Sequence, residues 1–348
     1  MEVLIVEEIV IYQTIWFVLW AVLWTGYFVL DGFDLGAGSL VYALGRDLKE
    51  RQKVYAAIGP FWDGNEVWLI TAGGATFAAF PITYAIMFSS LYAGLLLLLF
   101  SLIIRGIAVE YRNKHNDPKW QKTWDFLFFI GSVSPALLLG VVFANIFQGI
   151  PIDAEGIFQG GFFTLLNFYG ILGGLLFVAV FMMHGSCWMA FRTQGELSER
   201  ATKIGKTLWF LAVGLLVVFW VVSYMSTDMW NNYFENPVWF IVPVLTLVTG
   251  LAVMYFLNKA KYFLAWVSSS LTVLFFSAWA FVGLFPNMFP SSIDPAYSLT
   301  IYNSSSSLLT LKIMTVVAAI FVPIVLAYTF WVYKTFTSMK LNGEKFYY

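Results

Sequence analysis

Residues 82–104, ITYAIMFSSLYAGLLLLLFSLII, form a long apolar run that contains no charged side chain. A membrane-spanning helix needs roughly 20 consecutive apolar residues. Because the bilayer offers the backbone no hydrogen-bond partner, a spanning segment must be a helix or part of a closed barrel. The run is continuously apolar and lacks the alternation of barrel strands. It therefore predicts a transmembrane helix, which we extend over 82–111.

The composition shows that the rest of the chain has the same character. Of its 348 residues, 60% are hydrophobic and 11% are charged, against about 25% charged in a soluble protein. The mean hydropathy of +0.78 is too high for one water-soluble core. We predict an all-α polytopic membrane protein forming a single membrane domain, 1–348. Its nine transmembrane helices are expected at about 14–43, 56–79, 82–111, 121–147, 164–191, 205–226, 238–257, 262–285 and 308–335.

The basic residues lie almost entirely on one side of these nine crossings. Of the 19 lysines and arginines, only Lys312 lies toward the other side. The rest fall near loops 44–55, 112–120 and 192–204, the turn after 257, and the tail, which carries Lys334, Lys340 and Lys345. The positive-inside rule places the amino terminus outside and the carboxyl terminus in the cytoplasm of a prokaryotic inner membrane. The net charge of -1 gives no reason to expect a nucleic-acid partner.

Several ionisable side chains lie within the predicted helices, where a charge is costly and is by default a functional hypothesis. The first helix carries one acid pair and the second helix carries another, each spaced i,i+3 on one helix face. Arg105 lies inside the end of the third helix. The groups of the first four helices are Asp31, Asp34, Asp63, Glu66, Arg105, Glu110 and Asp125.

These groups cluster in the cytoplasmic half of the membrane, and two interpretations are open. Titratable groups reaching partway into the membrane are what a proton path from the cytoplasm needs. Alternatively, they form a buried ion-pair network around Arg105 that locks four helices together. Both can hold at once, because the outcome depends on the environment of each acid.

A pair of glycines on the first helix predicts close helix packing. Gly32 and Gly36 are four residues apart, beside the two acids of that helix. A small-xxx-small pair lets another backbone approach closely in a membrane. We therefore expect a neighbouring helix to pack against this face.

The chain offers few ligands for a haem or a metal. His115 lies in a charged loop, and His184 lies in the predicted fifth helix, three residues before the only cysteine, Cys187. Isolated residues of this kind are more often packed than ligating, since such centres need several placed ligands. There is no Walker A pattern and no nucleophile elbow. We expect no metal site, no catalytic residue and no cofactor held by the chain's own ligands.

Two segments resemble subunit II of cytochrome bd-type quinol oxidases. DGFDLG (31–36) and FWDGNEVWLITAGG (61–74) are similar to the first two helices of that family, and WDGNEVW is the most specific part. The likeness extends over about residues 12–335. It includes IGSVSP (130–135), NIFQGIP (145–151), FPNMFPSS (285–292) and SLTIYNSSSSLLTL (298–311).

The resemblance implies an architecture and an activity. It implies two four-helix bundles plus one extra helix, packed against a pseudo-symmetric subunit I that holds three haems, of b and d type, and the quinol site. The complex oxidises quinol, reduces dioxygen to water and takes up cytoplasmic protons. The resemblance leaves open a structural quinone and small single-helix subunits. The cyanide-insensitive branch shares these motifs, so the haem type also stays open.

The resemblance also implies roles for particular residues. The acid of the Trp-Asp-Gly-Asn motif, here Asp63, lies at a proton entrance between the subunits, and Glu110 matches a second acid of the family. Trp68, with Trp62 on the same helix, matches the lining of an oxygen route in some members. With the other acids, the proposed proton path is Asp63, Glu66, Glu110, Asp31 and Asp34, with Arg105 as their ion-pair partner.

One departure and two alternatives accompany this interpretation. Gly106 follows Arg105, where the family often has proline. A proton-coupled secondary transporter would also carry intramembrane acids, but such proteins often show repeat symmetry and sites at the midplane. Here the acids are off-centre and confined to the first half of the chain. A purely scaffolding membrane subunit is the other alternative, and a haem spectrum of the purified complex separates an oxidase from a transporter.

Overall fold

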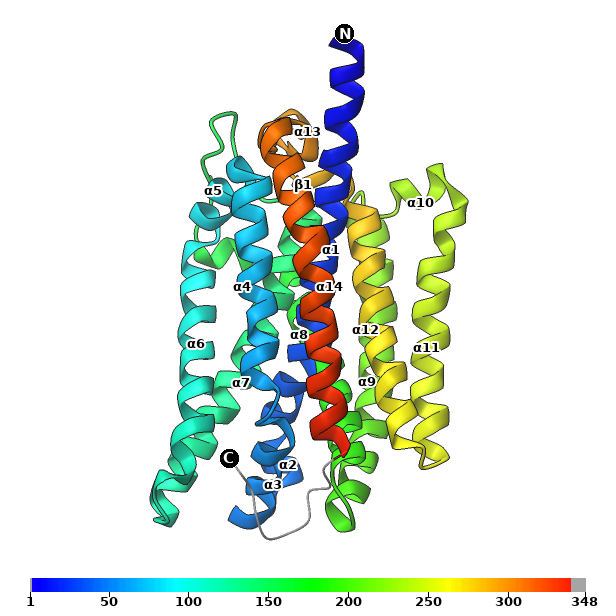
Figure 1. The fold of residues 1–348 in the computed structure, drawn as a ribbon. Helices are drawn as coiled ribbons and strands as arrows, with labels where there is room; N and C mark the ends of the chain where they lie inside the picture. The colour runs from blue at the N-terminus through cyan, green and yellow to red at the C-terminus, as the bar shows by residue number, and fades with distance from the viewer. Residues whose placement is uncertain (1, 339–348) are drawn as a thin grey trace.

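The structure is a computed structural model that describes the backbone of residues 2–338 and the side chains of residues 7–338. The predicted cytoplasmic lysines Lys340 and Lys345 lie outside this range. Long helices run roughly parallel to one another through the molecule (Figure 1). The fold is therefore all-α, as the sequence predicts.

Nine long helices lie within residues 2–338, and eight segments are long and apolar enough to cross a membrane. Each of the eight contains one of these helices, and the ninth, α4, is outside that set. The nine are α1 (Glu2–Ser39), α4 (Trp62–Ala79), α6 (Tyr92–Tyr111), α7 (Pro118–Gln148), α8 (Phe168–Arg192), α9 (Glu196–Ser226), α11 (Ile241–Asn258), α12 (Tyr262–Leu284) and α14 (Leu308–Ser338).

Helix α4 corresponds to the predicted second crossing, 56–79, but it begins only at Trp62. The preceding α3 (Leu48–Ile58) ends before Pro60, whose missing N–H cannot continue a helix. Polar residues in the first turns of α4, at positions 63, 65 and 66, interrupt its apolar run, and the helix is not among the eight apolar segments. Eight of the nine predicted crossings therefore meet the requirements of length and composition, and α4 does not.

Several predicted boundaries also differ from those in the structure. The segment 82–111 is two helices, α5 (Pro81–Ser90) and α6, separated at Leu91. The segment 14–43 ends as α1 at Ser39 and is followed by the short α2 (Val41–Leu44). Helix α9 begins at Glu196 rather than at 205, because polar residues extend it beyond its apolar stretch.

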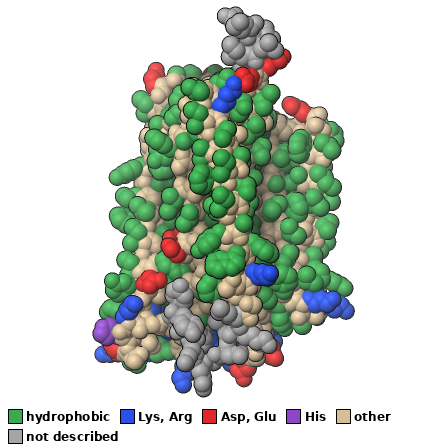
Figure 2. Space-filling view, in the orientation of Figure 1, with side chains coloured by type: hydrophobic (Ala, Val, Ile, Leu, Met, Phe, Trp, Pro, Cys, Tyr) green, Lys and Arg blue, Asp and Glu red, His purple; other side chains and the backbone are tan. Residues whose placement is uncertain are grey.

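The connections divide between the two ends of the bundle. Helices α2 and α3 lie at one end, together with the turns after α6, α8 and α11, which carry the basic residues (Figure 1). The opposite end holds α10 (Asn231–Glu235), α13 (Ile301–Ser304), and β1 (Asn287–Phe289) paired antiparallel with β2 (Leu299–Thr300). Figure 2 shows hydrophobic side chains over most of the intervening face and charged ones mainly toward its ends.

Helix α8 is the most buried of the membrane-length helices and packs against α1, α7, α9 and α12. The predicted close approach at the glycines of α1 is confirmed. A Cβ added to Gly36 would overlap the carbonyl oxygen of Phe181, and one added to Gly185 would overlap the backbone around Gly36. Glycines on both helices thus bring α1 and α8 into backbone contact.

Helix α14 lies at the periphery, against α1 and α4 (Figure 1). Very little of its apolar length is buried within this chain. Its described side chains include many exposed large hydrophobic residues, among them Ile313, Val316, Ile320, Phe321 and Phe330. The helix therefore presents a broad apolar surface to lipid or to another protein.

Candidate functional site

An ion-pair cluster lies between α1, α4 and α6. Nη2 of Arg105 is 2.7 Å from Asp31 Oδ1 and 2.5 Å from Glu66 Oε1, and its Nε donates to the same glutamate oxygen over 3.2 Å. Arg105 and Asp31 are buried, whereas the Glu66 side chain is 22% exposed. A buried cation is costly unless it is paired and hydrogen-bonded. The sequence predicts at least one acid beside Arg105, and the structure places Asp31 and Glu66 there.

Asp34 lies one turn further along α1 and is held by an amide. Asn65 Nδ2 donates to Asp34 Oδ2 over 2.7 Å and to the carbonyl oxygen of Leu30 over 3.0 Å. The Tyr333 hydroxyl of α14 donates to Asn65 Oδ1 over 3.0 Å. Sequence reasoning missed both Asn65 and Tyr333. Asn65 lies within the WDGNEVW motif, but no pattern in the neighbouring sequence indicates that Tyr333, near the end of α14, contacts it.

Asp63 and Glu110 are exposed in this chain, so they lie outside the buried ion-pair network that is one of the two interpretations of the sequence. The buried face of α4 carries Asn65, Ala72, Thr76 and Ala79 and packs toward α1. Asp63 lies on the opposite, exposed face with large apolar side chains. Helical periodicity decides this difference, because residues two apart point in different directions. Glu66 lies at the border between the two faces.

The two predicted oxygen-route tryptophans lie in different surroundings. Trp68 packs directly over Gly26 of α1, where an added Cβ would meet its ring. Trp62 lies over Gly106 of α6, so glycine at the position after Arg105 leaves room for that ring. The structure thus gives a packing reason for the departure from proline at 106.

Asp125 belongs to a second cluster rather than to the one around Arg105. Its Oδ1 is 2.5 Å from Nε of Arg112, and its Oδ2 is 3.2 Å from Nη1 of Arg51. Nearby, hydrogen bonds from Arg200 hold the pKa of Glu50 below its usual value. The predicted group of seven ionisable residues is therefore divided. One set is anchored on Arg105, a second on Asp125, and two acids lie exposed.

The histidines are placed as the sequence predicts, one exposed and one packed. His184 is fully buried, with Nδ1 2.7 Å from Ser269 Oγ and Nε2 3.0 Å from the carbonyl oxygen of Val29. Both ring nitrogens are thus engaged in joining α8 to α12 and α1. Cys187 is also buried. Among the described residues, no group of three or more His, Cys, Asp or Glu side chains could hold a metal ion.

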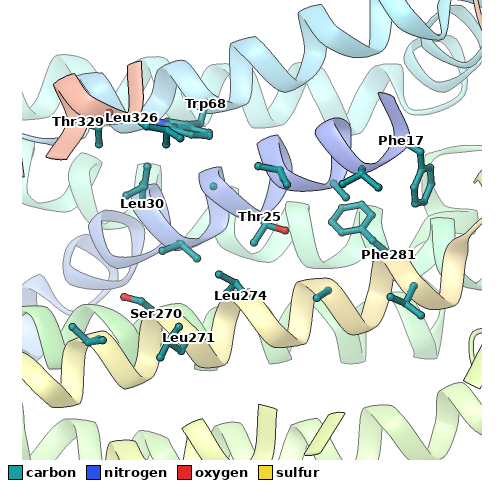
Figure 3. A pocket seen from close by; sticks show the side chains of 18 of the residues that line it. Phe17, Thr25, Leu30, Trp68, Ser270, Leu271, Leu274, Phe281, Leu326 and Thr329 are labelled. Atoms are coloured by element: carbon teal, nitrogen blue, oxygen red, sulfur yellow. The ribbon is translucent and has the colours of Figure 1, made fainter. Parts of the chain in front are cut away.

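An apolar groove of about 1600 Å³ runs along α1 between α12 and α14 (Figure 3). Its lining follows α1 from Phe17 to Leu30, a rise of about 20 Å at 1.5 Å per residue. Trp68 closes one side of it. One end of the groove reaches Glu235. The other end reaches Lys334 and Tyr333, the residue whose hydroxyl donates to Asn65.

The fold and the two clusters define a class of protein: a polytopic helical membrane protein with buried carboxylates at one end of its bundle. The chain belongs to the family of cytochrome bd terminal oxidase subunit II, whose family model matches residues 12–336. It is therefore part of a bacterial respiratory oxidoreductase complex, a membrane-bound terminal oxidase. The family implies that this complex also contains a subunit I and haem.

Known relatives agree with this assignment. The chain is 36% identical to cytochrome bd-I ubiquinol oxidase subunit 2 of Escherichia coli K12, with 92% of each chain covered. It is also 36% identical to cytochrome bd ubiquinol oxidase subunit 2 of Bacillus subtilis, covering 95% of this chain and 97% of that one. In fold it resembles the bd oxidase from Geobacillus thermodenitrificans, with a TM-score of 0.79 over 94% of this chain and 99% of that one at 13% identity.

Proposed function

We propose that this chain is the subunit of a quinol:oxygen oxidoreductase that ligates no haem, supports the haem-bearing subunit I and provides part of a cytoplasmic proton path. The complex would oxidise quinol and reduce dioxygen to water, a translocase reaction. The main support for the proposal is the spatial order of the acids, which runs from the surface of the chain to its interior. Exposed Asp63 is followed by half-buried Glu66, which shares Arg105 with buried Asp31.

The chemistry of these side chains suits proton transfer. A carboxylate can take up a proton from water and release it again, whereas an amide cannot. Asp63 and Glu66 are i,i+3 neighbours on α4, so a proton can pass along one helix edge. Glu110, exposed near the end of α6, would provide a second entrance from the same end of the bundle.

The exposed face of α4 is where we place subunit I. Asp63 shares this face with Val67, Ile70 and Phe77, and a lone carboxylate facing lipid would be costly. A Cβ added to Gly64, Gly73 or Gly74 would meet nothing within this chain, so a partner helix could approach closely there. Figure 2 shows acidic side chains among hydrophobic ones in the lower half of this side.

A partner covering α4 also accounts for the membrane topology. With subunit I beside it, the polar α4 need not face lipid and would form the ninth crossing. The chain would then consist of two four-helix bundles plus α14. Nine crossings place the basic loops, all at one end of the bundle, in the cytoplasm, with the amino terminus outside.

The test of the proton role is Asp63→Asn, which keeps the size and hydrogen-bonding capacity of the side chain but cannot transfer a proton. We expect the complex to assemble with its haems while quinol oxidase turnover falls roughly tenfold. This is less than the loss of a direct acid–base catalyst, because water and Glu66 remain. Oxygen consumption and proton uptake of the purified complex measure the effect.

Two further variants make this test specific. Asp63→Glu should retain more activity, since it restores a carboxyl group. Asp294→Asn, an exposed aspartate at the opposite end of the bundle, should turn over normally. Wild-type turnover of Asp63→Asn across the pH range would disprove the proton role, whereas failure to assemble would favour a structural role for Asp63.

The same proposal places the b- and d-type haems in subunit I. Because both nitrogens of His184 are engaged within the bundle, we expect this chain expressed alone to show no haem spectrum. In the assembled complex, His184→Ala should leave the haem absorption bands in place. A stoichiometric haem signal in the isolated chain that disappears in His184→Ala would contradict the proposal.

The apolar groove along α1 would accommodate a structural quinone. Its length suits an isoprenoid tail lying beside α12, and its lining is mostly apolar, with the hydroxyls of Thr25 and Ser270 along its length. Solvent extraction of the purified complex, followed by chromatography, would show whether quinone is retained after quinol-site inhibitors have displaced the substrate.

A further inference from the structure

Two carboxyl groups, those of Asp31 and Glu66, bind a single guanidinium in the buried cluster, and a third, that of Asp34, lies one helical turn from Asp31. Within residues 7–338, every ion pair of Asp31 and Glu66 is made to Arg105, and Asp34 has none. The arginines at the basic end of the bundle pair with other acids: Arg51 and Arg112 with Asp125, and Arg200 with Glu50. If all three carboxyl groups were ionised, this region would carry excess negative charge in a medium where an unpaired charge is very costly.

The hydrogen bonds decide which oxygens of the two aspartates are already occupied. Asn65 must direct its NH₂ toward Asp34, because the same NH₂ donates to Leu30 and its carbonyl oxygen accepts from Tyr333. Asp34 Oδ2 is therefore an acceptor. On Asp31, Oδ1 accepts from Arg105. Each aspartate thus uses one carboxyl oxygen and leaves the other.

The two remaining oxygens, Asp34 Oδ1 and Asp31 Oδ2, are buried and are not matched to a well-formed hydrogen bond within the described part of the chain, and the Tyr27 hydroxyl is the neighbouring donor to Asp31. An unsatisfied buried acceptor costs about 1–3 kcal/mol, and more when it is charged. The two residues are i,i+3 neighbours on one face of α1. A proton on Asp34 Oδ1 would remove one negative charge from the group, as in other sites where neighbouring carboxyl groups interact.

We propose that Asp34 carries a proton on Oδ1, the oxygen that Asn65 leaves free, so that this pair of acids holds one proton inside the subunit. This deepens the proposed function, in which both residues lie on the proton path, by giving that path an internal reservoir. Asn65, held by Tyr333, positions the pair. The charged and titratable groups around it are Tyr27 of α1, Glu66 of α4, Arg105 of α6 and Tyr333 of α14.

Infrared spectroscopy of the assembled complex tests the proposal, because the carbonyl stretch of a protonated carboxyl group lies above the amide bands. Exposed aspartates are ionised above about pH 4. At pH 7, with ¹³C-labelled aspartate side chains to identify the band, we expect Asp34→Asn to remove the signal of one protonated aspartate. Asparagine is uncharged, as the protonated acid is, and can still accept from Asn65, so the complex should assemble.

Two matched variants complete the experiment. Tyr27→Phe removes the other buried hydroxyl near Asp31 and should retain the band. Asn65→Leu removes the hydrogen bond to the Asp34 carbonyl and should shift the band to higher frequency, which provides a test even if Asp34→Asn does not assemble. Identical spectra of wild type and Asp34→Asn, or an unshifted band in Asn65→Leu, would overturn the proposal. Asp63→Asn should keep the band, so failure of the wider proton path would be seen separately.

Discussion

Arg105→Leu should prevent assembly of the oxidase or reduce its yield severely. The substitution leaves Asp31 and Glu66 without their cation in the interior of the bundle. Breaking a buried ion pair by removing one partner costs roughly 3–5 kcal/mol, because an uncompensated charge stays buried. Here two acids lose the same partner, so we expect a loss at the upper end of that range. Yield of haem-containing complex and its thermal unfolding midpoint would measure it.

Two controls separate burial from charge in this prediction. Arg105→Lys keeps the positive charge but lacks the planar guanidinium that donates to both acids. We expect its loss of yield and thermal stability to lie between those of wild type and Arg105→Leu. Lys312→Leu breaks an ion pair with Glu8 in which both side chains are more than a third exposed. Such surface pairs contribute about 1 kcal/mol or less, so its unfolding midpoint should stay near wild type. Normal yield and stability of Arg105→Leu would contradict a role for the cluster in the fold.

Gly36→Leu should be equally damaging, for a reason of shape rather than charge. Even a single Cβ at this position would overlap backbone atoms of Phe181, and α8 cannot yield because it packs against four other helices. Overpacking commonly costs about 1–3 kcal/mol, and a clash with backbone rather than a flexible side chain should exceed that range. Gly36→Ala should give a smaller loss in the same direction.

Gly214→Leu is the matched control for this steric prediction. Gly214 lies on an exposed face of α9, and a Cβ there would meet nothing. Because leucine is also the better helix former, the variant should unfold at or above the wild-type temperature. If Gly36→Leu and Gly214→Leu proved equally stable, the backbone contact between α1 and α8 would not be needed.

Features that depend on a single helix can be predicted from the order of its residues. Continuous apolar runs such as 82–104 are sufficient to predict helices, since hydrocarbon satisfies no backbone group. The depth of Arg105 in such a run is enough to predict an acidic partner, because the cost of an unpaired charge does not depend on the fold. Gly32 and Gly36 likewise predict a close neighbour, although not which helix it is.

The tertiary structure decided everything that depends on how separate helices face one another. Asp31, Glu66 and Arg105 come from three helices, and which acids meet the arginine follows from the rotation of each helix. The same rotation places Asn65 inside and Asp63 outside, although only two residues separate them. Tyr333 reaches Asn65 across 268 positions in sequence. No local pattern encodes such a contact, because it exists only once α14 has packed against α1 and α4.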